Sequence, residues 1–280
     1  MPHAHASDGA RLHYEVLGRA HSPVVLLIQG LGADKHGWDM QRIPLSLHYR
    51  VIAFDNRGAG RSDKPFSEYS LEQMADDAMA VLDAAGAERA HVVGASMGGA
   101  ITQIIGLKYP ERVSSLTLAC TACRNHAWRR ELLQRWATTA TERGMSAMTR
   151  EAARWVIGPR SFRRLLPAFG WLGPFGANRP AHAFAAQVRA ILSVDESLSG
   201  LLEQVTAPTL VLVGNQDILT PRGDSEEIAD RMPNAELVVI SGAAHGLMVE
   251  HATTFNRILL EFLGRVSRGS QQAAVASDVG

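Results

Sequence analysis

The stretch from His91 to Ala100, which reads HVVGASMGGA, decides how this chain folds. β-favouring residues lead into it, Gly94 and Gly98 flank Ser96, and an apolar run of helical length follows as far as Tyr109. This order predicts a buried strand, a tight turn and a helix, with the Ser96 hydroxyl at the apex of the turn. Because such a turn is sharp, a side chain at either flanking glycine would clash with the adjacent strand or helix.

The same turn gives Ser96 a chemical environment. It lies at the start of a helix, where free backbone N–H groups and the helix dipole favour a developing negative charge. The spacing Gly-x-Ser-x-Gly is typical of a nucleophile elbow. Serine is a weak nucleophile that needs a base, and the base needs an acid to orient it. The hypothesis therefore requires a carboxylate and then a histidine, each following a later strand.

Both requirements are met further along the chain. Asp217 follows the strand-like run that ends at Gly214, in GNQDILTP, and His245 follows the last such run, in SGAAHGLMVE. Because ligands bind at the carboxyl edge of open parallel sheets, we expect Asp217 and His245 to lie beside Ser96 at that edge. Each residue also has a non-catalytic interpretation. Ser96 could be an ordinary turn serine, Asp217 could cap a turn, and His245 could be a solvated loop histidine.

Apolar strand-like runs alternate with helical patterns along most of the chain. This alternation predicts an α/β fold with a mostly parallel sheet and helices on both of its faces. The segment 10–17 alternates apolar and polar residues and is predicted as an exposed or edge strand. The segments 24–28 and 50–54 are predicted as buried strands, and further strands are predicted at 91–95, 113–120, 207–214 and 236–240.

The alternation of strand-like and helical patterns stops between residues 124 and 204. This segment has no buried-strand run, carries four of the five tryptophans and mixes charged and apolar residues at helical spacing. It is too long for an ordinary loop, so we predict a helical insertion within a core made of residues 1–123 and 205–266. The tail 267–280 is polar and rich in small residues, and we predict that it is disordered.

Composition excludes several classes of function. The 280 residues carry 28 basic and 28 acidic side chains, without a basic stripe or a polybasic segment, so we expect no nucleic-acid partner and no membrane partner. No apolar run approaches the ~20 residues of a membrane span. The N-terminus lacks a charged region leading into an apolar one, which favours a cytoplasmic protein without a secretory signal.

The two cysteines, Cys120 and Cys123, end an apolar strand-like run in the spacing C-x-x-C. A redox pair would open a helix near the start of a βαβ unit, so we interpret these as two structural thiols. No second pair completes a zinc site, and we expect neither a metal nor a cofactor.

Four features in this order resemble the α/β-hydrolase family: the loop QGLG at 29–32, the loop DNRGAGRSD at 55–63, the elbow GASMGG at 94–99, and the late Asp217 and His245. The resemblance runs from about residue 10 to residue 266. It implies an eight-stranded sheet, with 124–204 as a helical cap. The chain is similar to carboxylesterases, 3-oxoadipate enol-lactonases and hydrolases of meta-cleavage products.

The resemblance also implies roles for individual residues. Ser96 would be the nucleophile, His245 the general base and then acid, and Asp217 the group that orients the imidazole. The oxyanion hole would consist of the backbone N–H groups of Leu31 and Met97. Many relatives carry histidine before the glycine of this loop, where the present chain has Gln29, whose amide can also hold the loop by hydrogen bonds.

The resemblance also bears on the charged residues of the loop 55–63 and on the tryptophans of the insertion. The charged residues of the second loop are interpreted as structural rather than catalytic; they are Asp55, Arg57 and Asp63. Tryptophans of the insertion are more often packing residues, but some should line the pocket, because cap residues face the site in this family. The candidates are Trp128, Trp155 and Trp171.

We therefore expect a cofactor-free serine hydrolase that cleaves an ester, lactone or related acyl bond of a small organic substrate. An elbow serine argues against epoxide opening and dehalogenation, which use aspartate. The alternatives are carbon–carbon hydrolysis of meta-cleavage diketones, an acyl-transfer, thioester-release or cyclisation step in a bacterial biosynthetic pathway, and a ligand sensor on the same scaffold. The oligomeric state, monomer or homodimer, stays open.

Overall fold

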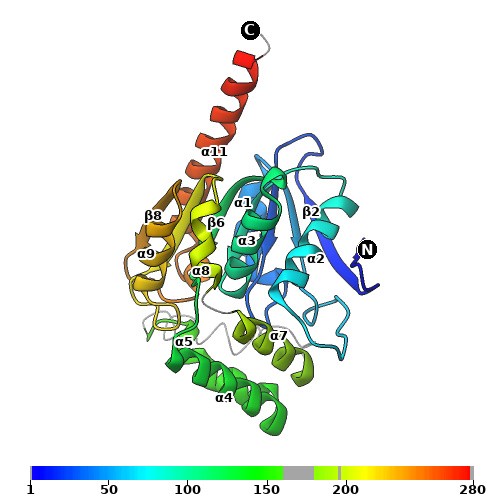
Figure 1. Ribbon diagram of the computed structural model, residues 1–280, viewed down its shortest axis with the longest axis vertical. Coiled ribbons are helices and arrows are strands. Elements are labelled where there is room, and N and C mark those ends of the chain that lie inside the picture. Colours follow the sequence, from blue (N-terminus) through cyan, green and yellow to red (C-terminus); the bar gives the residue numbers. More distant parts are fainter. Residues whose placement is uncertain (1, 160–179, 195–196, 278–280) are drawn as a thin grey trace.

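The computed structural model describes residues 2–159, 180–194 and 197–277 (Figure 1). Eight strands form one sheet in the order β1-β2-β4-β3-β5-β6-β7-β8. The pairs β1·β2 and β2·β4 are antiparallel and all other neighbours are parallel, which confirms the predicted mostly parallel sheet. The strands are β1 (His3–His5), β2 (Arg11–Leu17), β3 (Val24–Ile28), β4 (Arg50–Phe54), β5 (Ala90–Ala95), β6 (Val113–Ala119), β7 (Thr209–Gly214) and β8 (Ala235–Ile240).

The first edge of the sheet differs from the prediction. Residues His3–His5 form β1, which pairs with β2 so that Ala4 lies opposite Leu12. Strand β2, predicted as an exposed or edge strand, is therefore covered along part of its length. Three residues are too few to produce a readable alternation, and only the pairing reveals that Ala4 is buried.

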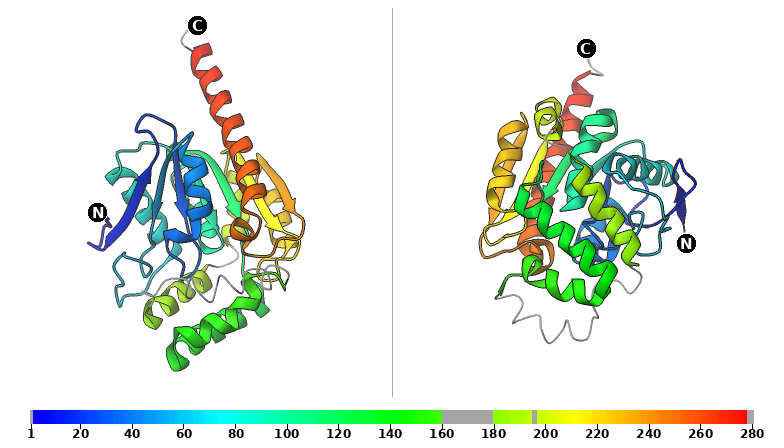
Figure 2. Two further views of the ribbon diagram at one scale, coloured as in Figure 1. Left: turned by 180° about the vertical axis from the view of Figure 1, so that it is seen from behind. Right: turned by 60° about the horizontal axis from the view of Figure 1, so that its bottom comes forward.

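Helices cover both faces of the sheet, as Figures 1 and 2 show. One apolar core lies under α2 (Leu71–Ala84), α3 (Met97–Lys108) and α9 (Arg222–Arg231). The other lies under α1 (Asp39–Ser46), α10 (Leu247–Glu250) and α11 (Ala252–Ser277). Short 3-10 helices lie at η1 (Lys35–Trp38), which buries Trp38, and at η2 (Pro110–Arg112). Strand β5 runs between β3 and β6 with all six residues buried, because both of its faces are covered.

Three helices lie across the carboxyl edge of the parallel strands: α4 (Ala127–Arg143), α5 (Met145–Val156) and α7 (Ala181–Ser193). We refer to these three as the cap helices. Their inward faces form a small apolar cluster that also takes in Leu219 from the loop after β7. The predicted helical segment thus lies partly over the edge where Ser96 was expected.

The last part of the predicted insertion lies elsewhere. Helix α8 (Ser197–Leu201) and the 3-10 helix η3 (Leu202–Gln204) pack against α3 and α9, beside the sheet rather than over its edge. Leu202 belongs to the core cluster under α3. Sequence periodicity shows that a segment is helical, but it does not show which neighbour its apolar face meets.

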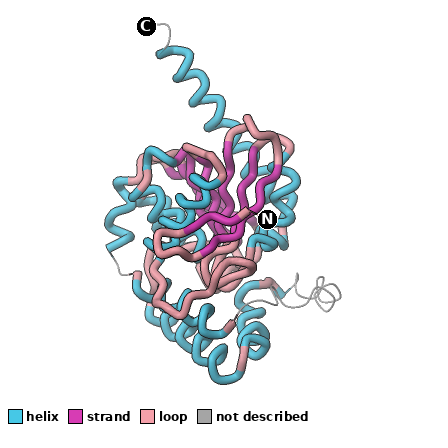
Figure 3. Tube along the Cα trace, turned by 90° about the vertical axis from the view of Figure 1, so that its right-hand side faces the viewer, coloured by secondary structure: helices cyan, strands magenta, loops and turns pink. Residues whose placement is uncertain are grey.

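The C-terminal tail also departs from the prediction. Residues predicted to be disordered from 267 onward continue α11 as far as Ser277, and the helix projects well beyond the sheet (Figures 1 and 3). The early turns of α11 bury Phe255, Leu259 and Leu263, so the costly nucleation is complete before the tail begins. Propagation then adds one hydrogen bond per residue. Within the described residues, no helix is both long enough and apolar enough to cross a membrane.

Candidate active site

The predicted elbow forms between β5 and α3. Ser96 adopts φ 55° and ψ −119°, in the left-handed region that residues other than glycine rarely occupy. A Cβ at Gly94 would lie 2.1 Å from the carbonyl oxygen of Gly98, and a Cβ at Gly98 would lie 2.2 Å from that of Ile28. Both glycines are therefore required by close backbone approach, as the sequence predicted.

Hydrogen bonds hold the strained residue from several directions. The Ser96 amide donates to the carbonyl of Ala119 at 2.9 Å, and the Ser96 carbonyl accepts from the Thr121 hydroxyl at 2.8 Å. The amide of Ala100 also donates to that carbonyl, at 3.1 Å. Backbone strain persists only where its surroundings over-determine it, and it occurs mainly at functional sites. The hydroxyl of Ser96 is thus presented by a fixed backbone.

The structure brings Asp217 and His245 to Ser96. His245 Nε2 lies 3.1 Å from Ser96 Oγ, and His245 Nδ1 lies 2.9 Å from Asp217 Oδ2. Because an ionised carboxylate only accepts, Nδ1 carries the proton and donates to Asp217. Nε2 then has a free lone pair that can accept the proton of the Ser96 hydroxyl. Three residues that follow three different strands therefore form one hydrogen-bonded chain.

Asp217 is buried, and residues of the loop after β7 donate hydrogen bonds to both oxygens of its carboxylate. Oδ1 accepts from the amides of Leu219 and Thr220, both at 2.9 Å, and Oδ2 accepts from the Thr220 hydroxyl at 2.8 Å. Burial by itself would raise the pKa of Asp217, but the charge and hydrogen bond of His245, with the bonds from Thr220, hold the pKa below its ordinary value. The carboxylate is therefore ionised opposite the imidazole.

The two predicted oxyanion donors belong to the two segments that adjoin Ser96. Met97 begins α3, and Leu31 follows Gly30, where a Cβ would lie only 3.0 Å from Cβ of Ser96 and 3.6 Å from its Oγ. Neither the Leu31 amide nor the Met97 amide donates to another group in the part of the chain that the structure describes. Both residues line the cavity over Ser96. The arrangement leaves two amides beside the hydroxyl.

Gln29 holds the loop in which relatives often carry histidine. Its side-chain oxygen accepts from the Gly30 amide at 2.8 Å, and its backbone carbonyl accepts from the Asn56 side chain at 2.9 Å. The next glycine, Gly32, donates its amide to the side chain of Gln187 on α7 at 2.8 Å. The loop is thus fixed both by Gln29 and by a cap helix.

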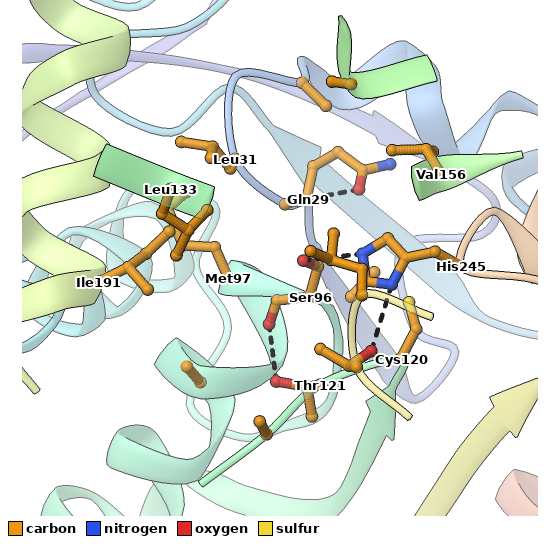
Figure 4. A pocket seen from close by; sticks show the side chains of 18 of the residues that line it. Gln29, Leu31, Ser96, Met97, Cys120, Thr121, Leu133, Val156, Ile191 and His245 are labelled. Carbon is orange, nitrogen blue, oxygen red and sulfur yellow. Dashed lines mark hydrogen bonds between the residues drawn. The ribbon is translucent and has the colours of Figure 1, made fainter. Parts of the chain in front are cut away.

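A cavity of about 570 Å³ opens above Ser96 and His245, between the sheet edge and the cap helices. Figure 4 shows Leu31, Met97, Leu133 and Ile191 on one side of Ser96, and Gln29, Val156 and His245 on the other. Asp217 lies behind His245 and does not line the cavity. The larger apolar lining residues include Leu31, Met97, Leu133, Trp136, Met148, Val156, Phe184, Ile191, Leu219 and Met248.

The predicted tryptophan contacts are wrong for two of the three candidates. Trp128, which is 39% exposed, and Trp155 stack on each other at 6.1 Å outside the cavity lining. Trp171 lies outside the described residues. Trp136, which was not among the candidates, is 3% exposed and lines the cavity.

Helical spacing could have identified Trp136. The buried positions of α4 include Leu132, Leu133, Trp136 and Ala140, which recur at the 3.6-residue period of one helix face. Trp128 precedes that run in the first turn of α4 and stays partly exposed. Residue type alone favoured the wrong tryptophan, whereas periodicity selects the right one.

The two cysteines form part of the cavity wall and are not linked to each other. Burial raises the pKa of the Cys120 thiol, and it raises the pKa of Cys123 to about 12. Both are therefore uncharged thiols, which fits the structural role predicted for them. Among the described residues, no three side chains of the metal-binding types are grouped to hold an ion.

The charged loop after β4 does not reach the cavity. Asp55 accepts from the amides of Lys35 and Arg61, both at 2.9 Å, while Arg57 pairs with Asp77 at 2.6 Å and Asp63 pairs with Arg11 at 3.1 Å. These contacts tie the loop to neighbouring elements. The structure thus agrees with the structural interpretation of this loop.

Comparisons with known proteins identify the family to which the chain belongs. Residues 23–161 match a family described as "alpha/beta hydrolase fold", and residues 187–273 match one described as "TAP-like protein". The chain is 33% identical over 274 residues to a Variovorax paradoxus protein named "Putative carbamate hydrolase RutD", covering 91% of this chain and 97% of that one.

Two solved structures are closely similar to the chain. The enol-lactonase from Burkholderia xenovorans has a TM-score of 0.88 and 27% identity, over 94% of this chain and 100% of that one. A thermophilic esterase from Thermogutta terrifontis has a TM-score of 0.87 and 27% identity, over 95% of this chain and 99% of that one. The chain therefore belongs to the α/β-hydrolase family and is an enzyme of the hydrolase class.

Proposed function

We propose that this enzyme hydrolyses an ester or lactone bond of an organic acyl compound, with Ser96 as nucleophile, His245 as general base and acid, and Asp217 as the orienting acid. One observation carries the proposal: the hydrogen-bonded chain from Asp217 through His245 ends at a hydroxyl that opens into a mainly apolar cavity of about 570 Å³. A substrate with an apolar acyl or alcohol part suits that cavity.

In the first half of the reaction Ser96 Oγ attacks the substrate carbonyl carbon while His245 Nε2 takes the hydroxyl proton. The carbonyl electron pair moves onto oxygen, and the amides of Leu31 and Met97 stabilise that oxyanion. Losing one such donor costs about 2.7–4 kcal/mol of transition-state stabilisation. Collapse of the intermediate breaks the bond to the alcohol oxygen, which leaves with the proton from His245. In a lactone this oxygen stays attached through the acyl chain.

In the second half, water replaces the alcohol. The water oxygen attacks the acyl-enzyme carbonyl while His245 takes a proton from the water. The oxyanion that forms is again stabilised by the amides of Leu31 and Met97. Breakage of the acyl–Ser96 bond then releases the carboxylic acid, and Ser96 regains its proton from His245. Asp217 stabilises the imidazolium in both halves and keeps its tautomer fixed, which its low pKa allows.

Carbamate hydrolysis is a second candidate, because several relatives at 31–33% identity carry that name. The same attack on a carbonyl would serve it. The size and apolar lining of the cavity favour a larger, less polar substrate. The two candidates differ in how rate depends on the length of the apolar chain.

Labelling with a fluorophosphonate probe tests the nucleophile. We expect the natural enzyme to be labelled, and Ser96→Ala and His245→Ala not to be. Equal labelling of Ser96→Ala would overturn the proposed mechanism. Steady-state rates on nitrophenyl esters of graded acyl length, on lactones, on a carbamate and on a meta-cleavage dienoate then identify the reaction. We expect kcat/KM to rise with acyl length until the cavity is filled.

A further inference from the structure

The side-chain amide of Gln29 has a donor that the protein does not use. Gln29 is 6% exposed and lines the cavity. Its Oε1 accepts from the Gly30 amide at 2.8 Å, and because a backbone N–H only donates, this bond fixes which end of the side-chain amide is oxygen. Within the described part of the chain, Nε2 has no acceptor. An amide N–H₂ on the cavity wall without a protein acceptor is a donor that a ligand can use.

The backbone around Gly37 makes room for this amide. A Cβ at Gly37 would lie 2.0 Å from Gln29 Nε2 and 2.8 Å from its Cδ, so the side chain lies directly against the backbone of the 3-10 helix η1. The amide is therefore held on both sides, by Gly30 through hydrogen bonding and by Gly37 through packing. Preorganised donors of this kind bind an acceptor without first losing conformational freedom.

Gln29 lies close to the reacting group. It precedes Gly30, where a Cβ would lie 3.6 Å from Ser96 Oγ, and in Figure 4 its amide nitrogen lies towards Val156, on the same side of Ser96 as His245. The side chains of Leu31 and Met97, whose amides are the predicted oxyanion donors, lie towards the other side. A substrate carbonyl at Ser96 would therefore have neighbouring atoms close to Gln29.

Other hydroxyl groups on the cavity wall are already engaged. Thr121 Oγ1 donates to the carbonyl of Ser96 and Thr149 Oγ1 donates to the carbonyl of Met145, each at 2.8 Å. Their protons are therefore not available to a ligand in this arrangement. Gln29 Nε2 differs from both because it faces the cavity without an acceptor.

We propose that Gln29 Nε2 binds a second, uncharged acceptor oxygen of the substrate, such as a ketone or amide carbonyl close to the scissile acyl group. This inference rests on the proposed acyl hydrolysis. An uncharged donor in an apolar cavity offsets the desolvation of a neutral oxygen more readily than that of a carboxylate. The enzyme would thereby select acyl chains that carry such an oxygen over purely hydrocarbon chains.

The test compares nitrophenyl hexanoate with a series of analogues in which one methylene of the acyl chain is replaced by a ketone carbonyl. The measured quantity is the ratio of kcat/KM for each oxo ester to that for the plain ester, in the natural enzyme and in Gln29→Met. Intrinsic ester reactivity is the same for both proteins, so it cancels when the two ratios are compared. We expect the ratio for the best oxo ester to fall about three- to tenfold in Gln29→Met, mainly through KM.

Two further variants make the test specific. Gly37→Ala displaces the Gln29 amide without changing residue 29, so we expect it to lower the same ratio. If Gln29→Met does not fold, Gly37→Ala is the variant that tests the inference. Thr149→Val removes a cavity hydroxyl whose proton is already donated to Met145, so we expect the ratio to stay unchanged.

A ratio that stays within twofold of the natural value in Gln29→Met or Gly37→Ala, for every analogue, overturns the inference. So does a Thr149→Val variant that lowers the ratio as much as Gln29→Met. Failure of the proposed function gives a different result: Ser96→Ala would then hydrolyse the plain ester as fast as the natural enzyme, and the inference would fall with it.

Discussion

The sheet and the cap helices are held together in different ways. Strands β3, β5 and β7 are packed on both faces within two large apolar cores, and the loops at their carboxyl ends hold Ser96 and Asp217 by several hydrogen bonds each. The cap helices share one small apolar cluster. The difference suggests that dense packing fixes the reacting groups, while a few contacts set the shape of the cavity above them.

Two buried polar side chains join the cap helices to the rest of the protein. Arg129 on α4 pairs with Asp224 on α9 at 2.6 Å and donates to the carbonyl of Leu219 at 3.1 Å. Gln187 on α7 accepts from the Gly32 amide and donates to the carbonyl of Arg57, both at 2.8 Å. Each connects a cap helix to a loop beside the site.

The first prediction concerns the sheet loops. Asp217→Asn should lower kcat about 10⁴-fold, because an asparagine amide can donate to His245 Nδ1 and so leave the proton on Nε2, where it blocks acceptance from Ser96. Thr220→Val, which removes one hydrogen bond to Asp217 Oδ2, is the control and should cost less than tenfold. Steady-state kinetics on one ester measure both. Similar losses in the two variants would contradict the role assigned to Asp217.

The second prediction concerns the attachment of the cap. Arg129→Met should lower the free energy of unfolding by about 3–5 kcal/mol, because it removes the guanidinium partner of the buried Asp224 and leaves only His126 Nε2, at 3.4 Å, beside that carboxylate. On the same helix, Arg135 pairs with Glu151 on the surface, and Arg135→Met should cost less than about 1 kcal/mol. Denaturant unfolding measures both values, and limited proteolysis shows whether α4 becomes accessible. If the two variants lost the same free energy of unfolding, Arg129 would stabilise the attachment of α4 no more than a surface ion pair does.

The third prediction concerns pH and the interior of the sheet. Burial lowers the pKa of His91 on β5 to about 4, while its unfolded value is about 6.5. Between these values the unfolded chain binds a proton that the folded chain does not, so stability is lost as the pH falls from 6.5 to 4. The loss should be about 3 kcal/mol larger in the natural protein than in His91→Gln, by denaturant unfolding at each pH. Parallel pH curves for the two proteins would refute this.

The smallest expected effect lies in the cap helices. Trp136→Leu should change kcat/KM for long-chain relative to short-chain esters by about three- to tenfold, because the side chain forms part of the cavity wall. Trp128→Leu is the matched control, since Trp128 stacks on Trp155 outside the cavity, and its ratio should stay unchanged. If the two variants shifted the ratio equally, the cavity boundary described here would be wrong.

The sequence predicted the central features of the fold because each has a local cause. Gly94 and Gly98 are needed within five residues of chain, and the run that forms β5 is apolar because both of its faces are covered. The position of Asp217 and His245 after strand ends follows from the parallel order of the sheet. Each of these patterns lies within a short segment, so it can be recognised in the sequence without knowledge of distant contacts.

Predictions failed where the outcome depends on contacts between distant segments. Strand β1 exists because it pairs with β2, and α11 continues past residue 266 because packed turns precede its tail. Helical spacing places Trp136 on the buried face of α4, but how α4 lies over the sheet edge decides that this face meets the cavity. Residue type does not carry that information.

The sequence by itself therefore determined the fold class, the elbow and the order of the three groups at the site, since those follow from backbone sterics and from the two-residue and 3.6-residue periods. Only the tertiary structure decided which side chains line the cavity and which end of the Gln29 amide faces it. The physical reason is that these depend on close packing and hydrogen bonding between segments far apart in the chain, such as Gln29 against Gly37 and Gln187 against Gly32.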